Sequence, residues 1–354
     1  MVKSMEQIDI PEIPFKRRLL YFIHSFLNLS KIDKILTHMI DTDGAIILMY
    51  HSVASDKNKW CIDPRNHIPE SIFEKHMKFL ATERNVISLD TLIDFIKVNK
   101  PLPRGTTVIT FDDGYFDNLT NAAPILKKYD LPATIYLATG YITREENQWI
   151  DELYTYFNER TNDRLIVPEI FENQRELYDF SVTWTTYSEI SKYLIVSTYE
   201  QRTHVLNSIK KQLIPNRVPP KLTMSWNDIR TLINENKNIT LGSHTFNHID
   251  LSKIDDLELI FEIQTSTDDI EREIGQRPVH FSCPYSRAAK NLPEILNKLG
   301  YESSVSDSTD LLINSNSFPY TLGRVEAPSS LSRLAHYTSG NYPRISKIVT
   351  GGRY

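Results

Sequence analysis

Short apolar runs alternate with amphipathic stretches along most of this chain. The strand-like runs are residues 45–50, 86–87, 108–111, 133–138, 239–241, 279–282, 303–305 and 321–325. Apolar residues at helical spacing lie between them, at residues 71–80, 89–98, 117–128, 255–274 and 291–299. Because strands that alternate with helices are typical of parallel βα units, the pattern predicts an α/β fold.

Two adjacent carboxylates follow one of these runs directly. Asp112, Asp113 and Gly114 come after the β-branched run that ends at Phe111. In α/β folds the carboxyl ends of the strands carry the chemistry. Neighbouring side chains of an extended chain point to opposite sides, which suits a division of labour in which one carboxylate binds a metal and the other handles protons. Asp-Asp-Gly is also common in turns, so the motif alone fits either a turn or a site.

Three histidines stand at or after strand-like runs. His244 and His248 follow residues 239–241, and on a helical turn their spacing would put both imidazoles on one face. With a carboxylate they would form a two-His, one-Asp metal set that leaves positions open for water and substrate. His51 ends the run at 45–50 and is an acid/base candidate at the same edge. These strand ends and the alternating elements predict an irregular, incompletely closed (β/α) barrel.

The motifs resemble those of a known family. Residues 110–114, Thr-Phe-Asp-Asp-Gly, and 244–248, His-Thr-Phe-Asn-His, are similar to the first two motifs of the polysaccharide deacetylases, the NodB-homology or carbohydrate esterase family 4 enzymes. The flanking segments 49–53, 118–129, 225–226 and 281–285 agree, and the resemblance covers residues 44–142 and 222–327. It implies a deformed barrel of the NodB kind that removes acetyl groups from N-acetylated sugars. It also implies a divalent metal ion, with Zn²⁺ expected ahead of other divalent ions.

The resemblance assigns a role to each motif residue. Asp113, His244 and His248 match the metal ligands, and Asp112 matches the catalytic base. Tyr285 matches the position whose backbone N–H helps to hold the oxyanion.

Two positions depart from the pattern of many members, and the general acid has two candidates. Ser282 stands where many members carry an arginine that orients the base, and Ser286 stands where many carry a glycine. The late Leu-x-x-His motif that supplies the acid has no clear match, because His336 stands in a different context. The chain is closer to the branch typified by poly-N-acetylglucosamine deacetylases, in which the acid histidine comes from an early strand, and His51 fits that place. The alternative for His51 is a structural histidine bonded to Asp112.

Residues 141–221 interrupt the family's pattern. They are rich in Glu, Asn, Thr and aromatic residues and predict several helices with one extended piece near residues 165–170. We therefore expect a deacetylase domain over residues 44–354 with a helical insertion at 141–221. The insertion is either a cap that only stabilises or a lid that recognises the sugar, for which Trp149, Asp151 and Trp184 are candidates.

Residues 1–43 predict an N-terminal helical extension. Its basic and aromatic part, residues 15–29, either packs on the barrel or makes a weak contact with a membrane surface. Polar residues interrupt its apolar stretch, which matches neither a signal peptide nor a membrane span, so we expect a cytoplasmic protein, at most peripheral to the inner membrane. The net charge is −5 and the chain has no stretch of basic residues interleaved with aromatic residues, so we do not expect it to bind nucleic acid. The expected partner is the carbohydrate substrate that the family resemblance implies.

Functions from different classes fit these observations. The first is a metal-dependent deacetylase of an N-acetylated sugar in the biosynthesis of a bacterial-type surface polysaccharide or glycolipid. The second is a catalytically inactive glycan-binding module on the same barrel, and an amidase or esterase on a non-sugar substrate is a weaker third. The intact aspartate pair and histidine pair favour the enzyme, because a binding module has no need of a carboxylate pair beside a metal.

Overall fold

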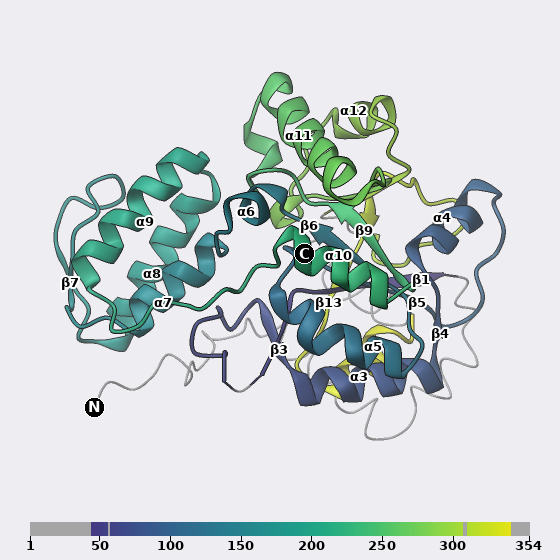
Figure 1. The fold of residues 1–354 in the computed structure, drawn as a ribbon, viewed down its shortest axis with the longest axis horizontal. Coiled ribbons are helices and arrows are strands. Elements are labelled where there is room, and N and C mark those ends of the chain that lie inside the picture. The colour runs from purple at the N-terminus through teal and green to yellow at the C-terminus, as the bar shows by residue number, and fades with distance from the viewer. Residues whose placement is uncertain (1–43, 56, 307–309, 341–354) are drawn as a thin grey trace.

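A sheet of parallel strands forms the centre of the protein. The structure, a computed structural model, describes residues 44–55, 57–306 and 310–340, and nine strands of that part of the chain form this sheet. Their order is β12 (Leu322–Gly323), β11 (Ser303–Ser306), β10 (His280–Ser282), β9 (Ile239–Ser243), β6 (Ala133–Leu137), β5 (Thr106–Phe111), β1 (Ala45–Tyr50) and β13 (Val325–Glu326), with β4 (Asn85–Val86) beside β5. The two ends of this order are halves of one segment, separated only by Arg324. The sheet therefore returns on itself with a single seam, and the predicted α/β, incompletely closed barrel is confirmed (Figure 1).

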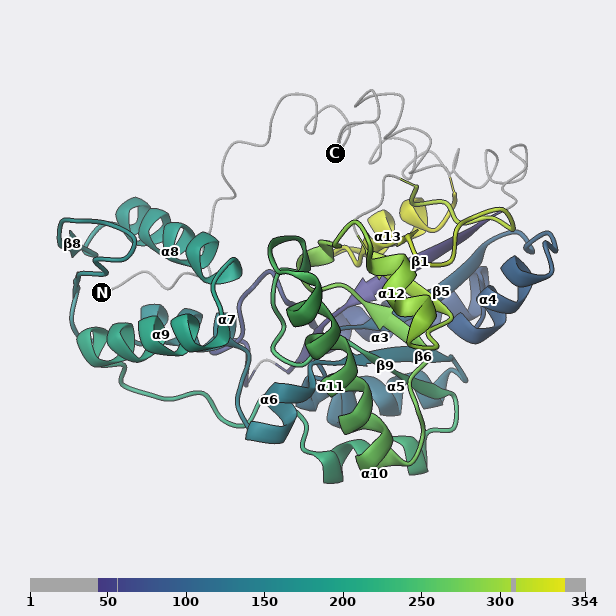
Figure 2. The ribbon, with the colours of Figure 1, turned by 90° about the horizontal axis from the view of Figure 1, so that it is seen from above.

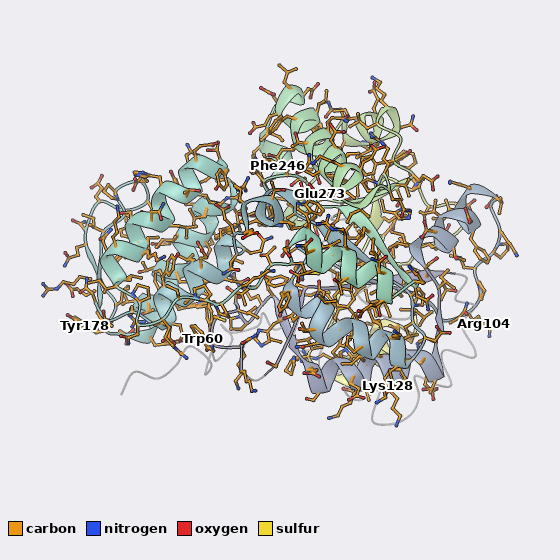
Figure 3. The ribbon with its side chains drawn as sticks, in the orientation of Figure 1. Trp60, Arg104, Lys128, Tyr178, Phe246 and Glu273 are labelled. Carbon is orange, nitrogen blue, oxygen red and sulfur yellow. The ribbon has the colours of Figure 1, made fainter. Side chains whose placement is uncertain are left out.

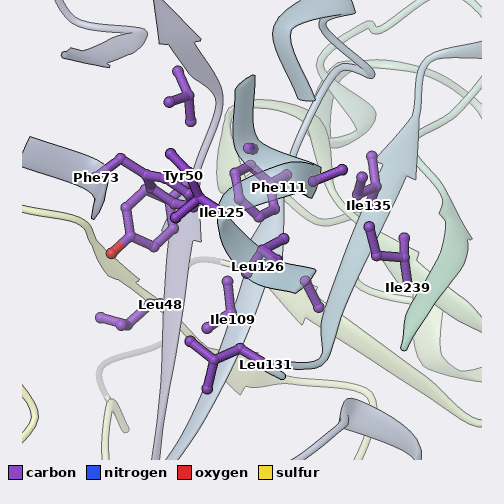
Figure 4. Packing of buried hydrophobic residues seen from close by; sticks show 14 of the residues in the cluster. Leu48, Tyr50, Phe73, Ile109, Phe111, Ile125, Leu126, Leu131, Ile135 and Ile239 are labelled. Atoms are coloured by element: carbon purple, nitrogen blue, oxygen red, sulfur yellow. The ribbon is translucent and has the colours of Figure 1, made fainter. Parts of the chain in front are cut away.

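The central strands are apolar because both of their faces are covered. β1 and β5 pair in register from Ala45 with Thr106 to Tyr50 with Phe111. Residues on the outer face, including Leu48, Tyr50 and Phe111, pack against the surrounding helices (Figure 4). Residues on the other face, such as Ile47 and Val108, pack with α4 and with side chains from β6, β11 and β12. The barrel interior is thus filled by side chains, and the strand ends are left to form a site.

Helices surround the barrel. They are α3 (Glu70–Glu83), α4 (Leu89–Lys97), α5 (Ala123–Lys128), α10 (Trp226–Glu235), α11 (Asp256–Ile274), α12 (Leu292–Lys298) and α13 (Leu331–Tyr337). In Figure 1, α3 and α5 lie below the strands, and α11 and α12 lie above them. The helix predicted over residues 117–128 begins as a π-helical turn, Asn118–Ala122, before α5. This turn directs Asp117 and Asn118 at the backbone of residues 51–53, which follow β1.

Between β6 and α10 the chain folds around a hydrophobic core of its own. After α6 (Thr139–Arg144) come α7 (Trp149–Asn158), the hairpin β7 (Arg164–Leu165) with β8 (Arg175–Glu176), α8 (Phe180–Ile195) and α9 (Tyr199–Leu213). We call residues 149–213 the helical unit; its core includes Leu153, Tyr187, Ile190 and Ile209, and it lies beside the barrel (Figures 1 and 2). The extended piece predicted near residues 165–170 is shorter, because only Leu165 of it belongs to a paired strand.

Polar contacts tie the helical unit to the barrel. Trp60, labelled in Figure 3, accepts a hydrogen bond from Asn158 on its carbonyl at 3.1 Å. Asp151 on α7 is fully buried and accepts hydrogen bonds from the Asp63 backbone N–H at 2.8 Å and from the Tyr115 hydroxyl at 2.7 Å. Burial raises the pKa of Asp151 well above its usual value. Asp151 is therefore a docking contact, and the expectation that it contributes to an exposed sugar-binding surface is wrong.

Two further predictions concern the N-terminal extension and contact with a membrane. The N-terminal extension over residues 1–43, with its segment 15–29, lies outside the described residues. Where the chain is described, no helix has the length and apolar character needed to cross a membrane.

A buried histidine on α3 should make the fold sensitive to acid. His76 is fully buried, with its Nδ1 3.2 Å from the Tyr50 hydroxyl, and burial lowers its pKa to about 4. In the unfolded chain a histidine has a pKa of about 6.5. Between these two values the unfolded chain binds a proton that the folded protein does not, so stability falls as the pH falls.

We expect His76 alone to remove about 2 kcal/mol of unfolding free energy between pH 7 and pH 5. The His76→Gln protein has nothing to titrate at this position, so its stability should fall by about 2 kcal/mol less over the same range. Urea unfolding at both pH values, with a metal chelator present, measures the difference. An identical pH dependence in the two proteins would contradict a neutral buried His76.

Candidate active site

The two aspartates lie at the carboxyl end of β5, as the sequence predicts. Both side chains are buried, and the Asp112 backbone N–H still donates to the carbonyl of Tyr50 at 2.9 Å, beyond the last strand residue. Asp113 and Gly114 then adopt left-handed φ angles of 72° and 74°. This sharp turn lets two neighbouring carboxylates stand at one edge of the barrel instead of on opposite faces of a strand.

Asp112 is held by an arginine that the sequence reasoning missed. Arg324 donates from its two terminal nitrogens to the two Asp112 oxygens at 2.7 and 2.6 Å, and to the Ser282 hydroxyl at 2.9 Å. Burial would raise the pKa of Asp112, but the Arg324 guanidinium, together with the nearby His244 and His51, outweighs burial and holds that pKa below its usual range. Arg324 thus fills the place left by Ser282 in the third motif. The sequence feature that could have identified Arg324 is that it is the one charged residue inside the strand-like run at 321–325.

Asp113, His244 and His248 converge on one point. The Nε2 atoms of His244 and His248 lie 3.6 and 3.2 Å from Asp113 Oδ1, and the three ligand atoms are within 4.8 Å of one another. Tetrahedral bonds of roughly 2.1 Å place ligand atoms about 3.4 Å apart, so these separations suit a shared ion. Asp113 Oδ1 is buried and receives no well-formed hydrogen bond from the described residues.

The protonation states also suit a metal. His244 Nδ1 lies 2.8 Å from the carbonyl of Ser282, to which it can only donate, and this leaves Nε2 with a free lone pair. Burial lowers the pKa of His244 to about 4, so the imidazole is neutral near pH 7. Two imidazoles and a carboxylate form an open donor set for a divalent ion.

The histidine segment is a loop rather than the helical turn that the spacing suggested. Thr245 and His248 have left-handed φ angles of 66° and 52°, which residues with a Cβ adopt only when their surroundings require it. The carbonyls of Thr245 and Phe246 accept from the backbone N–H groups of Thr139 and Gly140 at 3.2 and 2.8 Å. A Cβ on Gly140 would lie 2.4 Å from the Phe246 carbonyl, so this close approach requires glycine. We call residues 244–248 the metal loop.

Side chains complete the support of the metal loop. The carboxylate of Glu262 on α11 accepts from the Asn247 backbone N–H at 2.7 Å and from its side-chain amide at 2.8 Å. Arg202 of α9 donates to the carbonyls of Asn247 and His248 at 3.2 and 3.0 Å. Phe246, labelled in Figure 3, packs edge-on against Phe261 of α11. The loop is therefore held from the barrel and from the helical unit together.

Tyr285 and His51 both lie near this cluster. Tyr285 has a left-handed φ of 55°, and its ring packs against the His248 imidazole with centroids 4.7 Å apart. His51 follows β1, and its carbonyl accepts from the Asn118 amide at 2.8 Å. Burial raises the pKa of Asp113, but the neighbouring His248, His51 and His244 imidazoles together hold that pKa below its usual value. No hydrogen bond joins His51 to Asp112 in the described structure, and both roles considered for His51, the general acid and the structural histidine, stay predictions.

The other candidates lie elsewhere. His336 is fully buried on α13, close to the end of α3, where Arg84 donates to the Ala335 carbonyl and to the Thr338 hydroxyl, each at 2.9 Å. Trp184 stacks on Tyr187 inside the helical unit, with ring centroids 5.6 Å apart. Trp149, in contrast, donates from Nε1 to the Tyr285 hydroxyl at 2.9 Å and so reaches the site.

The fold and the site together define a class of protein. A parallel barrel with a buried Asp–His–His cluster and an arginine-held second carboxylate at its strand ends has the layout of a hydrolase that can use a metal ion. The chain belongs to the polysaccharide deacetylase family, whose sequence profile matches residues 99–304. The predicted family resemblance is therefore confirmed.

Two named relatives show the same membership over shorter stretches. Over 93 residues the chain is 37% identical to a "putative polysaccharide deacetylase YxkH" of Bacillus subtilis. The aligned stretch covers 26% of this chain and 30% of that protein. Over 85 residues it is 33% identical to a poly-beta-1,6-N-acetyl-D-glucosamine N-deacetylase of Staphylococcus aureus. This aligned stretch covers 24% of this chain and 29% of that protein. The chain thus matches less than a third of the length of either relative.

Solved structures share the fold over most of the chain. The Streptococcus pyogenes deacetylase PplD in complex with acetate superposes with a TM-score of 0.55 at 15% identity, covering 84% of this chain and 98% of that one. IcaB from Ammonifex degensii gives a TM-score of 0.52 at 17% identity, covering 84% and 97%. At these identities the likeness concerns the fold alone.

Proposed function

We propose that this protein is a metal-dependent deacetylase that hydrolyses the acetamide group of an N-acetylated sugar during the biosynthesis of a surface polysaccharide or glycolipid. The observation that carries the proposal is the buried Asp113, His244 and His248 cluster beside Asp112, whose carboxylate Arg324 holds. Family membership and the named activity of the Staphylococcus relative support the sugar substrate.

Amide hydrolysis needs an activated water, a stabilised oxyanion and a protonated leaving amine. A divalent ion bound by Asp113, His244 and His248, with Zn²⁺ expected first, would polarise the acetyl carbonyl and acidify a water molecule. Asp112 accepts the proton of the attacking water. Arg324 keeps this carboxylate ionised and fixes both of its oxygens, so it acts as a positioning residue.

The remaining steps use Tyr285 and His51. The backbone N–H of Tyr285 donates to the oxyanion as the carbonyl carbon becomes tetrahedral. His51 donates a proton to the amine as the carbon–nitrogen bond breaks, because an unprotonated amine is a poor leaving group. The products are acetate and the free amino sugar.

The alternative of an inactive binding module rests on the altered third motif. Many family members carry an arginine at the position of Ser282. In this chain Arg324, at the seam of the barrel, supplies that guanidinium instead. A buried, bidentate ion pair that fixes Asp112 beside the Asp113, His244 and His248 cluster suits turnover better than ligand binding alone. The arrangement therefore favours the enzyme.

Acetate release is the direct test of this proposal. The metal-loaded protein should release acetate from at least one of polymeric, lipid-linked or nucleotide-linked acetamido sugars, and a chelator should abolish the release. The three substrate arms separate a polymer-directed enzyme from one that acts on a precursor. A metal-loaded, folded protein that binds these sugars without releasing acetate would favour the binding module.

Changing the guanidinium that holds Asp112 should lower turnover without removing metal. Arg324→Lys keeps the charge but loses the two-pronged contact, so we expect kcat to fall by about 10- to 100-fold. The bound metal, measured by elemental analysis, should stay at the level of the unaltered protein. Arg287→Lys is the control, because Arg287 also pairs with an aspartate but is not part of the cluster. Its guanidinium lies 2.6 Å from the Asp250 carboxylate. Equal kcat values for Arg324→Lys and the control would remove Arg324 from the mechanism.

A further inference from the structure

Two side chains of the helical unit reach the metal loop or a residue beside it. Arg202 lies in the first turn of α9, is buried, and donates to the carbonyls of Asn247 and His248 at 3.2 and 3.0 Å. Trp149 begins α7, and its Nε1 donates to the Tyr285 hydroxyl at 2.9 Å. Both contacts therefore end on, or next to, a ligand of the proposed metal.

Arg202 is held in one geometry by its other hydrogen bonds. Its Nε donates to the Leu194 carbonyl at 3.0 Å, and one terminal nitrogen donates to the Ser197 carbonyl at 3.3 Å, at and just after the end of α8. The Tyr141 hydroxyl accepts from the other terminal nitrogen at 3.2 Å. With the two bonds to the metal loop, all five N–H groups of the guanidinium are used. A lysine, with three donors on a flexible stem, cannot reproduce this connection between α8 and the metal loop.

Trp149 fixes the partner of the His248 ring. The Tyr285 hydroxyl lies 3.2 Å from His248 Nδ1 and 3.3 Å from the His248 carbonyl. When Nε2 is a metal ligand, Nδ1 carries the hydrogen, so the Tyr285 oxygen accepts from both the imidazole and the indole. The hydroxyl then donates to the His248 carbonyl, and every donor in this set has an acceptor. The indole of Trp149 thereby holds the hydroxyl that orients the His248 imidazole.

The two ends of the metal loop have different supports. At its start, backbone N–H groups of residues 139–140, which follow β6, donate to the carbonyls of residues 245–246. At its end, the carbonyls of residues 247–248 accept from Arg202. His248 has a left-handed φ of 52°, a conformation that persists only where its surroundings fix it. The helical unit therefore contributes restraint at the end of the loop that carries this ligand.

We propose that Arg202 and Trp149 are positioning residues of the metal site, so that metal binding and docking of the helical unit on the barrel stabilise each other. The proposal rests on the proposed function and deepens it, because it gives the helical unit a role in holding the metal site. Side chains that orient a histidine ligand are typically worth about 10- to 100-fold in metal affinity. By thermodynamic linkage, metal binding stabilises the docking by the same factor.

Metal affinity tests this proposal independently of turnover. Zn²⁺ and Co²⁺ are titrated into the chelator-treated full chain in competition with a chromophoric chelator. Arg202→Lys and Trp149→Phe should each weaken binding by about 10- to 100-fold. Trp149→Phe keeps an aromatic ring and removes the Nε1 donor, so it decides the question if Arg202→Lys fails to fold. The visible absorption of bound Co²⁺, which depends on ligand geometry, should change in the same two proteins.

Arg160→Lys and Trp184→Phe are the matched controls, because both residues belong to the helical unit and neither has a described hydrogen bond or ring contact with the metal loop. Arg160 donates to the carbonyls of Phe157 and Leu177 at 2.6 and 2.8 Å, and Trp184 stacks on Tyr187. These controls change the same kinds of side chain inside the same unit. Both should bind Zn²⁺ with the affinity of the unaltered protein.

Hydrogen exchange measures the reciprocal effect. Zn²⁺ should slow exchange of the backbone amides of α9 in the unaltered protein and in Arg160→Lys, and should slow it less in Arg202→Lys. Zn²⁺ affinities of Arg202→Lys and Trp149→Phe that equal those of the controls would overturn the positioning role, even if the protein releases acetate. Affinity that depends on these two residues without any acetate release would keep the positioning role and overturn the proposed function.

Discussion

Asp112→Asn should give a folded, metal-loaded protein that has lost nearly all turnover. Asparagine keeps the shape of the side chain but cannot accept the proton of the attacking water, and general-base catalysis is worth about 10²- to 10⁴-fold. The metal should remain, because the ligand set of Asp113, His244 and His248 does not include this carboxylate. Acetate release and elemental analysis on the same preparation measure both properties.

Asp113→Ala is the matched comparison, and it should lose metal and turnover together. Asp112→Asn also leaves Arg324 buried without its carboxylate, which is destabilising by several kcal/mol in comparable cases. Thermal unfolding must therefore accompany both assays, so that loss of fold is not read as loss of chemistry. If Asp112→Asn releases the ion as readily as Asp113→Ala does, the two aspartates do not have separate roles.

The sequence predicts those parts of the site that depend on local pattern. Residues 45–50 are an uninterrupted apolar run, and β1 covers the same residues. The strands that deliver Asp112 and His244 are predictable in the same way, because parallel strands covered on both faces are apolar throughout. Since the carboxyl ends of parallel strands share one edge, the sequence alone predicts that His51, Asp112 and His244 lie at the same edge of the barrel.

Contacts between distant segments are beyond that reasoning. Arg324 and Asp112 are 212 residues apart, and only the pairing of the segment 322–326 with β11 and β1 brings them together. The helical turn predicted for residues 244–248 is wrong because bonds from Gly140, Glu262 and Arg202 hold them in a loop. A spacing of four residues carries no information about such partners.

Strained backbone conformations are concentrated in the segments that form the candidate active site. Several of the described non-glycine residues with left-handed φ belong to the site segments: Asp113, Thr245, His248, Tyr285 and Ser286. Each such residue costs of the order of 1 kcal/mol and persists only where its surroundings fix it. The supports from α11 and from the helical unit supply that restraint at the metal loop. The helical unit is thus part of the site as well as its neighbour.

His51→Ala should keep the fold and the metal and lose about a hundred- to ten-thousandfold in turnover on an amide. His51 stands after β1, and the contacts that position it reach its backbone: Asn118 donates to its carbonyl, and Asp117 accepts from Ser52 and from the Val53 N–H. Removal of the imidazole leaves these contacts intact. A general acid must be protonated when the carbon–nitrogen bond breaks, because the amine leaves poorly without a proton.

The leaving group separates this role from a structural one. An alcohol needs protonation less than an amine does, so an acetyl ester of the same sugar should recover part of the turnover that His51→Ala loses on the amide. The comparison requires kcat for both substrates in His51→Ala and in the unaltered protein, with metal content measured in each. Asp112→Asn is the internal reference, because a missing base should affect both substrates to a similar extent. Equal losses on amide and ester in His51→Ala would mean that the imidazole shapes the pocket around Asp112 and Asp113 and that another group protonates the amine.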